Sequence, residues 1–325
     1  MNTVILFPGR KSDLVSRVSA LPDIRVLIAN TTEELRARLP EAEVMITSNR
    51  IYEAEAAQVI RELGKKLRWI QFTTSGVDKA IKNGLPEGVS VTNASGFHAR
   101  RVAEHAMSLL LSVIRQYGET FAARPREVWV RDDVSPRTTS LERKTMLVIG
   151  LGAVGQDIAR KAKAFDMRVI GISRSVGSLP NVDEIRPREQ MLAAIAEADV
   201  IALGMTYDET THHMIDAKAF AAMKPTAVLV NVARGLLIDE AAMIAALREK
   251  KIFGAGLDVT SEEPLPAGSP LWSLPNVVLT PHIAGAGGDN TEAVVKIFAD
   301  NYALYRQNAP LGKLVYGPKI APAAR

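Results

Sequence analysis

The stretch from Thr145 to Ser175 constrains the fold of this chain more than any other segment. An apolar run, Met146 to Ile149, leads into a glycine-rich turn, which opens a segment with apolar residues at helical spacing. A second β-prone run, Val169 to Ile172, follows. Strand, turn, helix and strand in this order predict a βαβ unit with two parallel strands.

The turn has the spacing G-x-G-x-x-G at Gly150, Gly152 and Gly155. In such a turn the first glycine permits a tight bend, the second admits a pyrophosphate and the third lets the helix pack on the strand. The phosphates would lie at a helix N-terminus, where the first N–H groups lack partners and the peptide dipoles favour negative charge. A glycine turn can also be purely structural, but its place between strand and helix favours dinucleotide binding.

Composition limits the class of protein. A chain of 325 residues with 47% apolar and 23% charged residues is expected to form about two globular domains. The net charge of +4 is mild and its cations are scattered among acids, so we expect no nucleic-acid partner. The absence of cysteine excludes disulfides and zinc–thiolate sites, and we predict no metal site. With no signal peptide and no membrane-length apolar run, the expected location is the cytoplasm, away from membranes.

The first part of the chain alternates short β-prone runs with helical patterns, which predicts a parallel sheet covered by helices. The predicted strands are Thr3–Phe7, Ile24–Ala29, Val44–Thr47, Arg68–Phe72 and Val89–Thr92. No glycine motif follows the first of them, so we expect a separate α/β domain that contributes to substrate binding.

The loop from Thr73 to Asp78 is the best candidate for chemistry in this first domain. It follows a strand, and open α/β sheets bind ligands beyond the carboxyl ends of their strands. An ordinary strand-to-helix turn with hydroxyl caps is the alternative. A ligand bound at this loop would also lie near the segment Ser48 to Tyr52, where Arg50 either binds an anion or lies in solvent.

A helix predicted from Arg100 to Arg115 begins the second domain. His98 and His105 lie on or beside it, and we interpret them as capping or packing residues rather than catalysts. The stretch from Phe121 to Arg143, which carries Trp129, reads as an irregular excursion over the surface or onto a partner subunit.

Further strand and helix patterns complete a doubly wound sheet in the second domain. The strands are expected at 200–203, 227–231, 253–257 and 277–279, and the helices at 188–197 and 239–249. A last helix, 289–307, is expected to return to the first domain. The sequence therefore predicts two α/β domains with a cleft between them, a smaller one of residues 1–97 with 287–325 and a dinucleotide-binding one of residues 98–286.

Three ionisable residues follow predicted strands of the second domain: Arg234 after Asn231-Val232-Ala233, a glutamate in Asp258 to Pro264, and His282 in Thr280-Pro281-His282. This set suits reduction of a 2-oxo acid. A guanidinium binds a carboxylate with two hydrogen bonds, and an imidazolium held by a carboxylate can give a proton to a carbonyl oxygen. The alternative is a helix-capping arginine, solvated glutamates and a loop histidine.

At these residues the chain resembles the D-isomer-specific 2-hydroxyacid dehydrogenases. This family includes glyoxylate and hydroxypyruvate reductases, D-lactate dehydrogenases and phosphoglycerate dehydrogenases. The resemblance spans nearly the whole chain, and its specific pieces are Gly150–Gly155, Met223-Lys224-Pro225 through Gly235, Asp258–Pro264 and Thr280-Pro281-His282. It implies a Rossmann cofactor domain and a smaller flavodoxin-like substrate domain.

The resemblance also implies roles for single residues. Arg234 corresponds to the substrate-binding arginine, His282 to the proton donor, and Glu263 to the acid that polarises it, which makes Glu262 a bystander. Backbone amides of Ser75, Gly76 and Val77 would hold the substrate carboxylate. The family further implies a homodimer, with the helix 100–115 and the loop after it at the interface.

The expected cofactor is NADPH, with NAD as a weaker alternative. Ser173 stands where NAD-using relatives carry an acid, and Arg174 beside it can bind a 2′-phosphate. Thr206-Tyr207-Asp208 replaces the usual Pro-Leu-Thr, so contacts of that segment cannot be transferred from the family. The expected cofactor contacts are Gly150, Gly152, Ala153, Val154, Gly155, Ser173, Arg174, Ser175, Val232, Ala233 and Asp258.

The function that follows is NADPH-dependent reduction of a small 2-oxo acid, glyoxylate or hydroxypyruvate, to a D-2-hydroxy acid. A 3-phosphoglycerate dehydrogenase is an alternative, although the chain ends at Arg325 without the regulatory domain that many of those enzymes carry. A formate dehydrogenase is disfavoured, because that branch has glutamine at the position of Glu263. A cofactor-sensing binding protein, like the C-terminal binding protein corepressors, is the alternative from another class.

Overall fold

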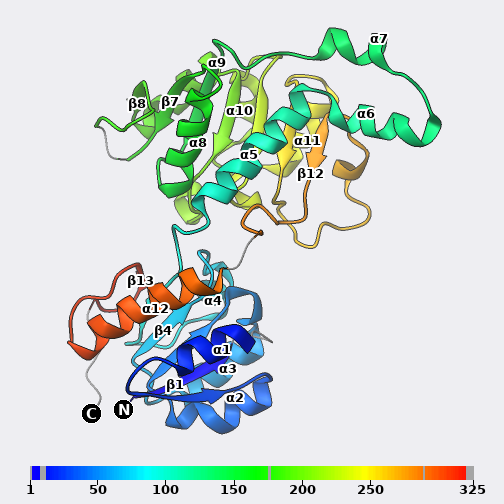
Figure 1. Cartoon of the computed structure of the whole chain (residues 1–325). Coiled ribbons are helices and arrows are strands. Elements are labelled where there is room, and N and C mark those ends of the chain that lie inside the picture. Colours follow the sequence, from blue (N-terminus) through cyan, green and yellow to red (C-terminus); the bar gives the residue numbers. More distant parts are fainter. Residues whose placement is uncertain (1, 8–11, 175–176, 288–289, 320–325) are drawn as a thin grey trace. The chain divides into compact units, whose positions relative to one another are not determined.

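The computed structural model describes residues 2–7, 12–174, 177–287 and 290–319. The chain forms two compact units: unit 1 comprises Met1–Phe97 and Gly288–Arg325, and unit 2 comprises His98–Gly287. Each unit is built on its own sheet with helices on both faces (Figure 1). Within the described ranges, no helix is long and apolar enough to cross a membrane.

Unit 1 contains a six-stranded sheet in the order β13-β5-β4-β3-β1-β2. The strands are β1 (Asn2–Phe7), β2 (Ile24–Ile28), β3 (Val44–Thr47), β4 (Trp69–Phe72), β5 (Ser90–Thr92) and β13 (Leu314–Tyr316). The first five are parallel and have the flavodoxin-like order 2-1-3-4-5. The predicted parallel sheet of five strands is thus confirmed, and a sixth strand that was not predicted, β13, runs antiparallel to β5 at one edge.

Helices cover both faces of this sheet. They are α1 (Ser12–Ser19), α2 (Thr32–Arg38), α3 (Ala54–Leu63), α4 (Asp78–Asn83) and α12 (Thr291–Arg306). Helices α1 and α12 share one apolar cluster with the sheet, and α2, α3 and α4 share the other. The ring of Trp69 in β4 stacks on Phe298 of α12, with centroids 5.1 Å apart, so the last long helix belongs to unit 1.

A buried polar network fixes α12 on the sheet. Gln71 Oε1 accepts the hydroxyl proton of Thr92 at 2.7 Å and an amide proton of Asn301 at 3.2 Å. Asn301 also donates to the carbonyl oxygen of Gly312 at 3.1 Å and accepts from its N–H at 2.8 Å. Because these buried groups satisfy one another, the network sets the register of α12 and of the segment that leads into β13.

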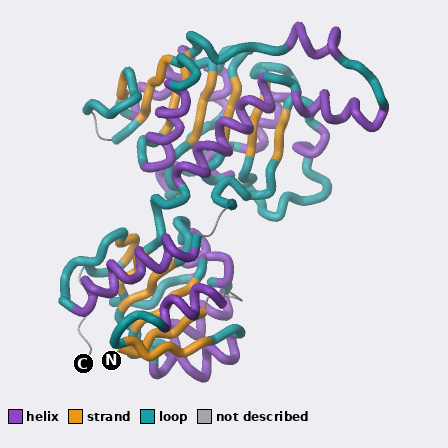
Figure 2. The backbone as a smooth tube through the Cα atoms, in the orientation of Figure 1, coloured by secondary structure: helices purple, strands orange, loops and turns teal. Residues whose placement is uncertain are grey.

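Unit 2 contains a seven-stranded parallel sheet in the order β12-β11-β10-β9-β6-β7-β8. Figure 2 shows the strands between their helices. The strands are β6 (Thr145–Ile149), β7 (Arg168–Ile172), β8 (Glu184–Arg186), β9 (Val200–Leu203), β10 (Val228–Asn231), β11 (Gly254–Leu257) and β12 (Val277–Leu279). From β8 to β11 this is the Rossmann order 3-2-1-4-5-6, with β12 added at the edge.

The strands of unit 2 are apolar on both faces because helices cover both. The helices are α5 (Ala99–Ile114), α8 (Ala153–Lys163), α9 (Met191–Glu197), α10 (Ala217–Ala222) and α11 (Glu240–Arg248). In β6, Met146 and Val148 pack toward α5 and α8, whereas Leu147 and Ile149 pack toward α9, α10 and α11. Continuous burial explains why these strands appear in the sequence as uninterrupted apolar runs.

The stretch from Phe121 to Arg143 is more regular than the sequence indicated. It includes the end of α6 (Tyr117–Ala123) and all of α7 (Arg131–Val134), with 3-10 turns at Arg124–Arg126 and Ser135–Arg137. In Figure 1, α6 and α7 reach out from the rest of unit 2. The stretch exposes large apolar side chains, of which Trp129 is 89% accessible.

Candidate active site

The glycine turn of unit 2 has the geometry that a dinucleotide requires. Gly150 follows β6 with a φ of +93°, and a Cβ there would lie 2.5 Å from Met205 Cβ. A Cβ on Gly155 would lie 1.9 Å from the Gly150 carbonyl oxygen. A Cβ on Gly152, the N-cap of α8, would meet open space. The outer glycines therefore allow the close packing of strand and helix, and the space at the helix N-terminus fits a pyrophosphate.

This turn lies at the point where the strand order of the sheet reverses. Strand β6 pairs with β7 on one side and with β9 on the other, and the chain winds away from β6 in both directions. In open α/β sheets, ligands bind beyond the carboxyl ends of the strands at this point. The turn is therefore at the expected ligand-binding edge of the sheet.

Ser173 and Arg174, which are expected to contact the ribose end of the cofactor, follow β7 at the same edge of the sheet. The backbone N–H of Ser173 donates to the carbonyl oxygen of Arg186 at 3.2 Å, and the Arg174 side chain is exposed. Ser175 lies outside the described residues. Hydrogen bonds from Thr210 lower the pKa of Asp208, and the charge of Arg174 lowers it further. The segment 206–208, which differs from the usual Pro-Leu-Thr of the family, is thus close enough to Arg174 for the charge of Arg174 to act on Asp208.

Arg234 follows β10 in a turn held by a buried amide. Asn231 Oδ1 accepts the N–H of Ala233 at 3.0 Å, and Asn231 Nδ2 donates to the Arg234 carbonyl oxygen at 2.8 Å. Arg234 Nη1 donates to the carbonyl oxygen of Ala233 at 2.6 Å, and the Arg234 side chain is half-buried. The expected cofactor contacts Val232 and Ala233 are buried in the same turn.

A glycine brings the Arg234 turn against the segment that carries the glutamate. A Cβ on Gly235 would lie 2.0 Å from the carbonyl carbon and oxygen of Thr260. Glu240 adds a second link, because its Oε2 accepts the N–H of Ser261 at 2.9 Å. The turn after β10 and the segment after β11 are therefore held in direct contact.

His282 and Glu263 form a hydrogen-bonded pair. His282 Nδ1 lies 2.7 Å from Glu263 Oε2, and the two side chains are 48% and 38% accessible. Burial raises the pKa of the Glu263 carboxyl, but the hydrogen bond and charge of His282 lower it more, so this pKa lies below its usual value. Since an ionised carboxylate only accepts, His282 Nδ1 is the donor, and its Nε2 is the nitrogen that can exchange a proton with a ligand.

Glu263 is also tied to its own loop and to the arginine. The N–H of Thr260 donates to Glu263 Oε1 at 3.3 Å, and the charge of Arg234 contributes to the lowered pKa of Glu263. The neighbouring Glu262 takes part through its backbone, where its carbonyl oxygen accepts the Thr260 hydroxyl proton at 2.7 Å. The structure therefore brings Arg234, Glu263 and His282 together.

Asp258 anchors the loop that carries His282. Its buried carboxylate accepts the hydroxyl proton of Thr280 at 2.6 Å and the N–H groups of Ile283 and Ala284 at 2.9 and 2.8 Å. Burial raises the pKa of Asp258, but a hydrogen bond from His105 and those from Thr280 and the two N–H groups outweigh burial, and the pKa is lowered. Asp258 was expected among the cofactor contacts, and the structure adds this role as an anchor.

His282 itself has a backbone conformation that is unfavourable for a residue other than glycine. Its φ is +54°, and its N–H donates to the carbonyl oxygen of Asp258 at 2.8 Å. A left-handed conformation costs on the order of 1 to 3 kcal/mol and persists where surrounding contacts enforce it. The contacts to Asp258 on both sides of His282 supply that restraint.

The candidate loop of unit 1 follows β4 and is braced by side chains. Thr74 Oγ1 accepts the N–H of Asn49 at 3.2 Å and donates to the Gly76 carbonyl oxygen at 2.9 Å. Asn93 Nδ2 donates to the Ser75 carbonyl oxygen at 2.6 Å. Asn49 also caps α4, accepting the N–H groups of residues 79 and 80, so the loop has an amide cap in place of the hydroxyl cap considered from sequence.

The neighbouring segment 48–52 contains one exposed and one buried side chain of interest. Arg50 is exposed in the 3-10 turn Asn49–Ile51. Tyr52 is fully buried, its hydroxyl donates to the carbonyl oxygen of Gly84 at 3.4 Å, and burial raises its pKa well above the usual value. Tyr52 is thus a core residue, and Arg50 is a side chain of this segment that is exposed to solvent.

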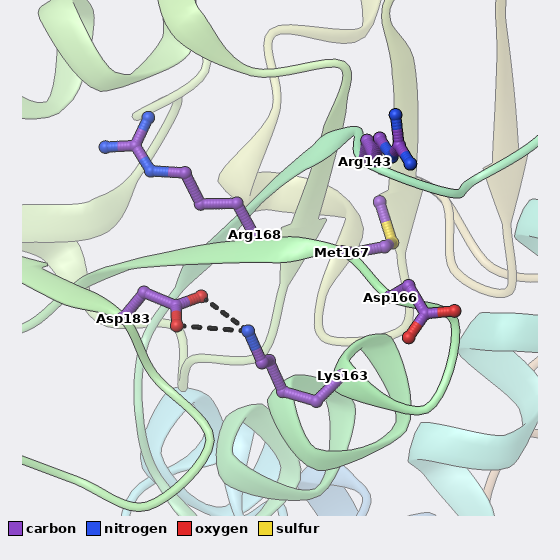
Figure 3. Close-up of a pocket in the computed structure, with 6 residues that line it drawn as sticks. All are labelled: Arg143, Lys163, Asp166, Met167, Arg168 and Asp183. Atoms are coloured by element: carbon purple, nitrogen blue, oxygen red, sulfur yellow. Dashed lines mark hydrogen bonds and ion pairs between the residues drawn. The ribbon is translucent and has the colours of Figure 1, made fainter.

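A surface pocket of about 430 Å³ lies elsewhere in unit 2 (Figure 3). Its lining residues are Arg143, Lys163, Asp166, Met167, Arg168 and Asp183. They precede β6, β7 and β8 or begin β7, so the pocket is at the amino ends of the strands, opposite the glycine turn. Two of its charges form an ion pair, with Lys163 Nζ 2.9 Å from Asp183 Oδ2. This pocket is not part of the candidate site.

Comparison with known proteins identifies relatives that cover most of the chain. Residues 107–284, within unit 2, match the model of the D-isomer specific 2-hydroxyacid dehydrogenase NAD binding domain. A glyoxylate reductase of Pyrococcus furiosus is 35% identical over 288 residues, which cover 85% of this chain and 82% of the relative. A glyoxylate/hydroxypyruvate reductase B of Yersinia enterocolitica is 30% identical over 306 residues, covering 92% of each chain.

A solved structure has the same architecture. The crystal structure of a D-isomer specific 2-hydroxyacid dehydrogenase family protein from Aeromonas salmonicida has a TM-score of 0.84 and 30% sequence identity. The match covers 97% of this chain and 99% of that one.

Proposed function

The chain belongs to the D-isomer specific 2-hydroxyacid dehydrogenase family, and from that premise we propose that it reduces small 2-oxo acids to D-2-hydroxy acids with NADPH. The observation that carries this proposal is the His282–Glu263 pair, 2.7 Å apart, beside Arg234 at the carboxyl edge of the sheet that holds the glycine turn. An acid, its carboxylate partner and a guanidinium at a cofactor site suit this reaction.

NADPH, when bound, supplies a hydride to the carbonyl carbon of the substrate. Arg234 binds the substrate carboxylate through two parallel hydrogen bonds. His282 gives the proton on Nε2 to the carbonyl oxygen, while Nδ1 keeps its hydrogen bond to Glu263. Glu263 stabilises the imidazolium before transfer and holds the ring in one orientation. Backbone amides of 75–77 are our candidates for further contacts to the carboxylate.

The cofactor preference rests on Ser173 and Arg174. An acid at the end of the second strand accepts hydrogen bonds from the ribose hydroxyls of NAD and repels a 2′-phosphate. Here that position is a serine, and the exposed Arg174 can form charge-assisted hydrogen bonds with the phosphate. We therefore propose that the protein uses NADPH in preference to NADH.

Glyoxylate and hydroxypyruvate are the proposed substrates. The Pyrococcus furiosus relative is a glyoxylate reductase and the Yersinia enterocolitica relative a glyoxylate/hydroxypyruvate reductase, and both cover most of the chain. The test is NADPH oxidation with a panel containing glyoxylate, hydroxypyruvate, pyruvate and 3-phosphohydroxypyruvate. Tight NADPH binding without turnover of any of them would instead support a cofactor-sensing protein.

We also propose that the protein is a homodimer formed through the segment of α5, α6 and α7. Tyr117, Phe121, Val128 and Trp129 are exposed in this segment, and apolar side chains gathered in one exposed stretch mark a protein contact. Light scattering after size exclusion measures the mass directly, and Trp129→Ser should shift it toward the monomer. A monomer at micromolar concentration would refute the dimer.

A further inference from the structure

His105, which the sequence suggested to be a packing or capping residue, contacts the loop that carries His282. It lies in the middle of α5, and its side chain is 19% accessible. His105 Nε2 lies 2.8 Å from Thr280 Oγ1 and 3.3 Å from Asp258 Oδ1. The same oxygen of Asp258 receives the Thr280 hydroxyl proton at 2.6 Å.

The donors and acceptors in this cluster can be assigned from its chemistry. A carboxylate only accepts, and the lowered pKa of Asp258 keeps it ionised at neutral pH. The single hydroxyl proton of Thr280 is therefore given to Asp258. Thr280 Oγ1 is left as an acceptor, so Nε2 of His105 carries the proton and donates it. The chain of hydrogen bonds runs from α5 through Thr280 to Asp258.

This series of hydrogen bonds ends on the loop that carries His282. Asp258 receives N–H groups of residues 283 and 284 on one side of His282 and the Thr280 hydroxyl on the other. His105 adds a polar link between this loop and a long helix that is buried against the sheet, beside the apolar packing of Ala284 on the same helix. Removing its donor takes away the hydrogen bond that Thr280 Oγ1 accepts and weakens the restraint on the start of the loop, where the bond from Thr280 to Asp258 remains.

We propose that His105 is a positioning residue that holds the Thr280–Ala284 loop in the geometry in which His282 meets Glu263. The inference rests on the proposed function, because it concerns proton transfer by His282. His105 reaches Thr280 and Asp258 and acts on the reaction through them.

The test compares three variants of the full-length protein. His105→Leu removes the donor at similar size, and His105→Gln keeps an N–H near the position of Nε2. Ser112→Ala is the control, because it removes the hydrogen bond from Ser112 to the Ser108 carbonyl oxygen on the same helix without touching the loop. We expect kcat to fall about tenfold or more in His105→Leu, since small misplacements of reacting groups are costly. The KM for NADPH should stay within about twofold, and His105→Gln should recover most of the loss.

Hydrogen–deuterium exchange of the cofactor-free protein provides a second readout that needs no catalysis. The amides of residues 282–284 are bonded to Asp258 and should exchange slowly. His105→Leu should speed their exchange, whereas His105→Gln and Ser112→Ala should leave it unchanged. If His105→Leu does not fold, Thr280→Val removes the same bond from the loop side and should give the same two effects.

The outcomes separate this inference from the proposed function. The positioning role would be overturned if His105→Leu kept the kcat of the unmodified protein, or if its amides 282–284 exchanged at the unmodified rate. It would also be overturned if His105→Gln failed to recover activity. An unmodified protein that turns over no 2-oxo acid would refute the proposed function. In that event the exchange measurement would still decide whether His105 holds the loop.

Discussion

Nδ1 of His282 lies 2.7 Å from Oε2 of Glu263, although 19 residues separate them in the chain. The lowered pKa of Glu263 means that the carboxylate is charged above about pH 4.5 and loses its charge only as pH falls through the lowered value. At neutral pH the pair is therefore a charged carboxylate that accepts a hydrogen bond from the imidazole Nδ1.

Replacing this carboxylate should change the pH profile. The alkaline limb of kcat/KM reports loss of the proton from the free enzyme's acid. Glu263→Gln removes the charge that stabilises the imidazolium, so the limb should move to lower pH. Glu262→Gln is the matched control and should leave the limb in place. If the alkaline limb of kcat/KM does not move in Glu263→Gln, Glu263 does not stabilise the imidazolium of the proton donor.

Removing the imidazole should cost most of the turnover. General acid catalysis contributes about 100- to 10,000-fold, so His282→Ala should lose roughly that much kcat. The affinity for NADPH, measured by fluorescence titration, should change little. A variant that retains most of its kcat would exclude His282 as the proton donor.

Arg234 should not tolerate lysine. A planar guanidinium matches the two oxygens of a carboxylate, whereas an ammonium cannot. A charge-assisted hydrogen bond is worth about 1.5 to 3 kcal/mol, so Arg234→Lys should lower kcat/KM roughly tenfold or more. Arg168→Lys, at the opposite edge of the sheet, is the control. An unchanged kcat/KM for Arg234→Lys would leave Arg234 with a structural role only.

Asp258 should stabilise unit 2 in a pH-dependent way. Its pKa is lowered in the folded state, so its contribution is present above about pH 4 and is lost as pH falls through the folded value. Asp258→Asn replaces an acceptor that faces two N–H groups and should lower the free energy of unfolding at pH 7 by about 1.5 to 3 kcal/mol.

Urea unfolding at pH 7 and pH 3, followed by circular dichroism, measures this difference. The gap between Asp258→Asn and the unmodified protein should narrow at the lower pH. Asp13→Asn, at an exposed ion pair in unit 1, should change stability by less than about 1 kcal/mol. If the difference in the free energy of unfolding between Asp258→Asn and the unmodified protein is the same at both pH values, the lowered pKa of Asp258 is contradicted.

Much of the fold could be predicted from the sequence because buried strands have a clear signature. Val200–Leu203 and Val277–Leu279 have the predicted bounds, and the apolar run of β6 was placed to within a residue. Strand β8 was missed because it is short and charged, and Arg186 in it pairs with Glu184 at 2.6 Å. Strand β13 was missed because its antiparallel pairing with β5 depends on where α12 delivers the chain.

For the candidate site, the sequence allowed prediction of single residues but not of the contacts that hold them in place. The residue types after each strand indicated Arg234, Glu263 and His282, and the parallel sheet brings those strand ends to one edge. The contact between His105 and Thr280 was not predictable, because the two residues are 175 positions apart in the chain. A histidine in the middle of a helix has no pattern that reports which loop packs against it. That contact depends on how α5 crosses β11 and β12.

The most direct test of the central claim is kcat/KM measured with NADPH and with NADH, using glyoxylate and hydroxypyruvate at the same concentrations. A contact from Arg174 to the 2′-phosphate worth about 1.5 to 3 kcal/mol predicts that NADPH is favoured by at least roughly 10- to 100-fold. Ser173→Asp with Arg174→Ala should erase or invert that ratio. Equal or better use of NADH by the unmodified protein would contradict the cofactor assignment, and no turnover of either 2-oxo acid would contradict the proposed activity.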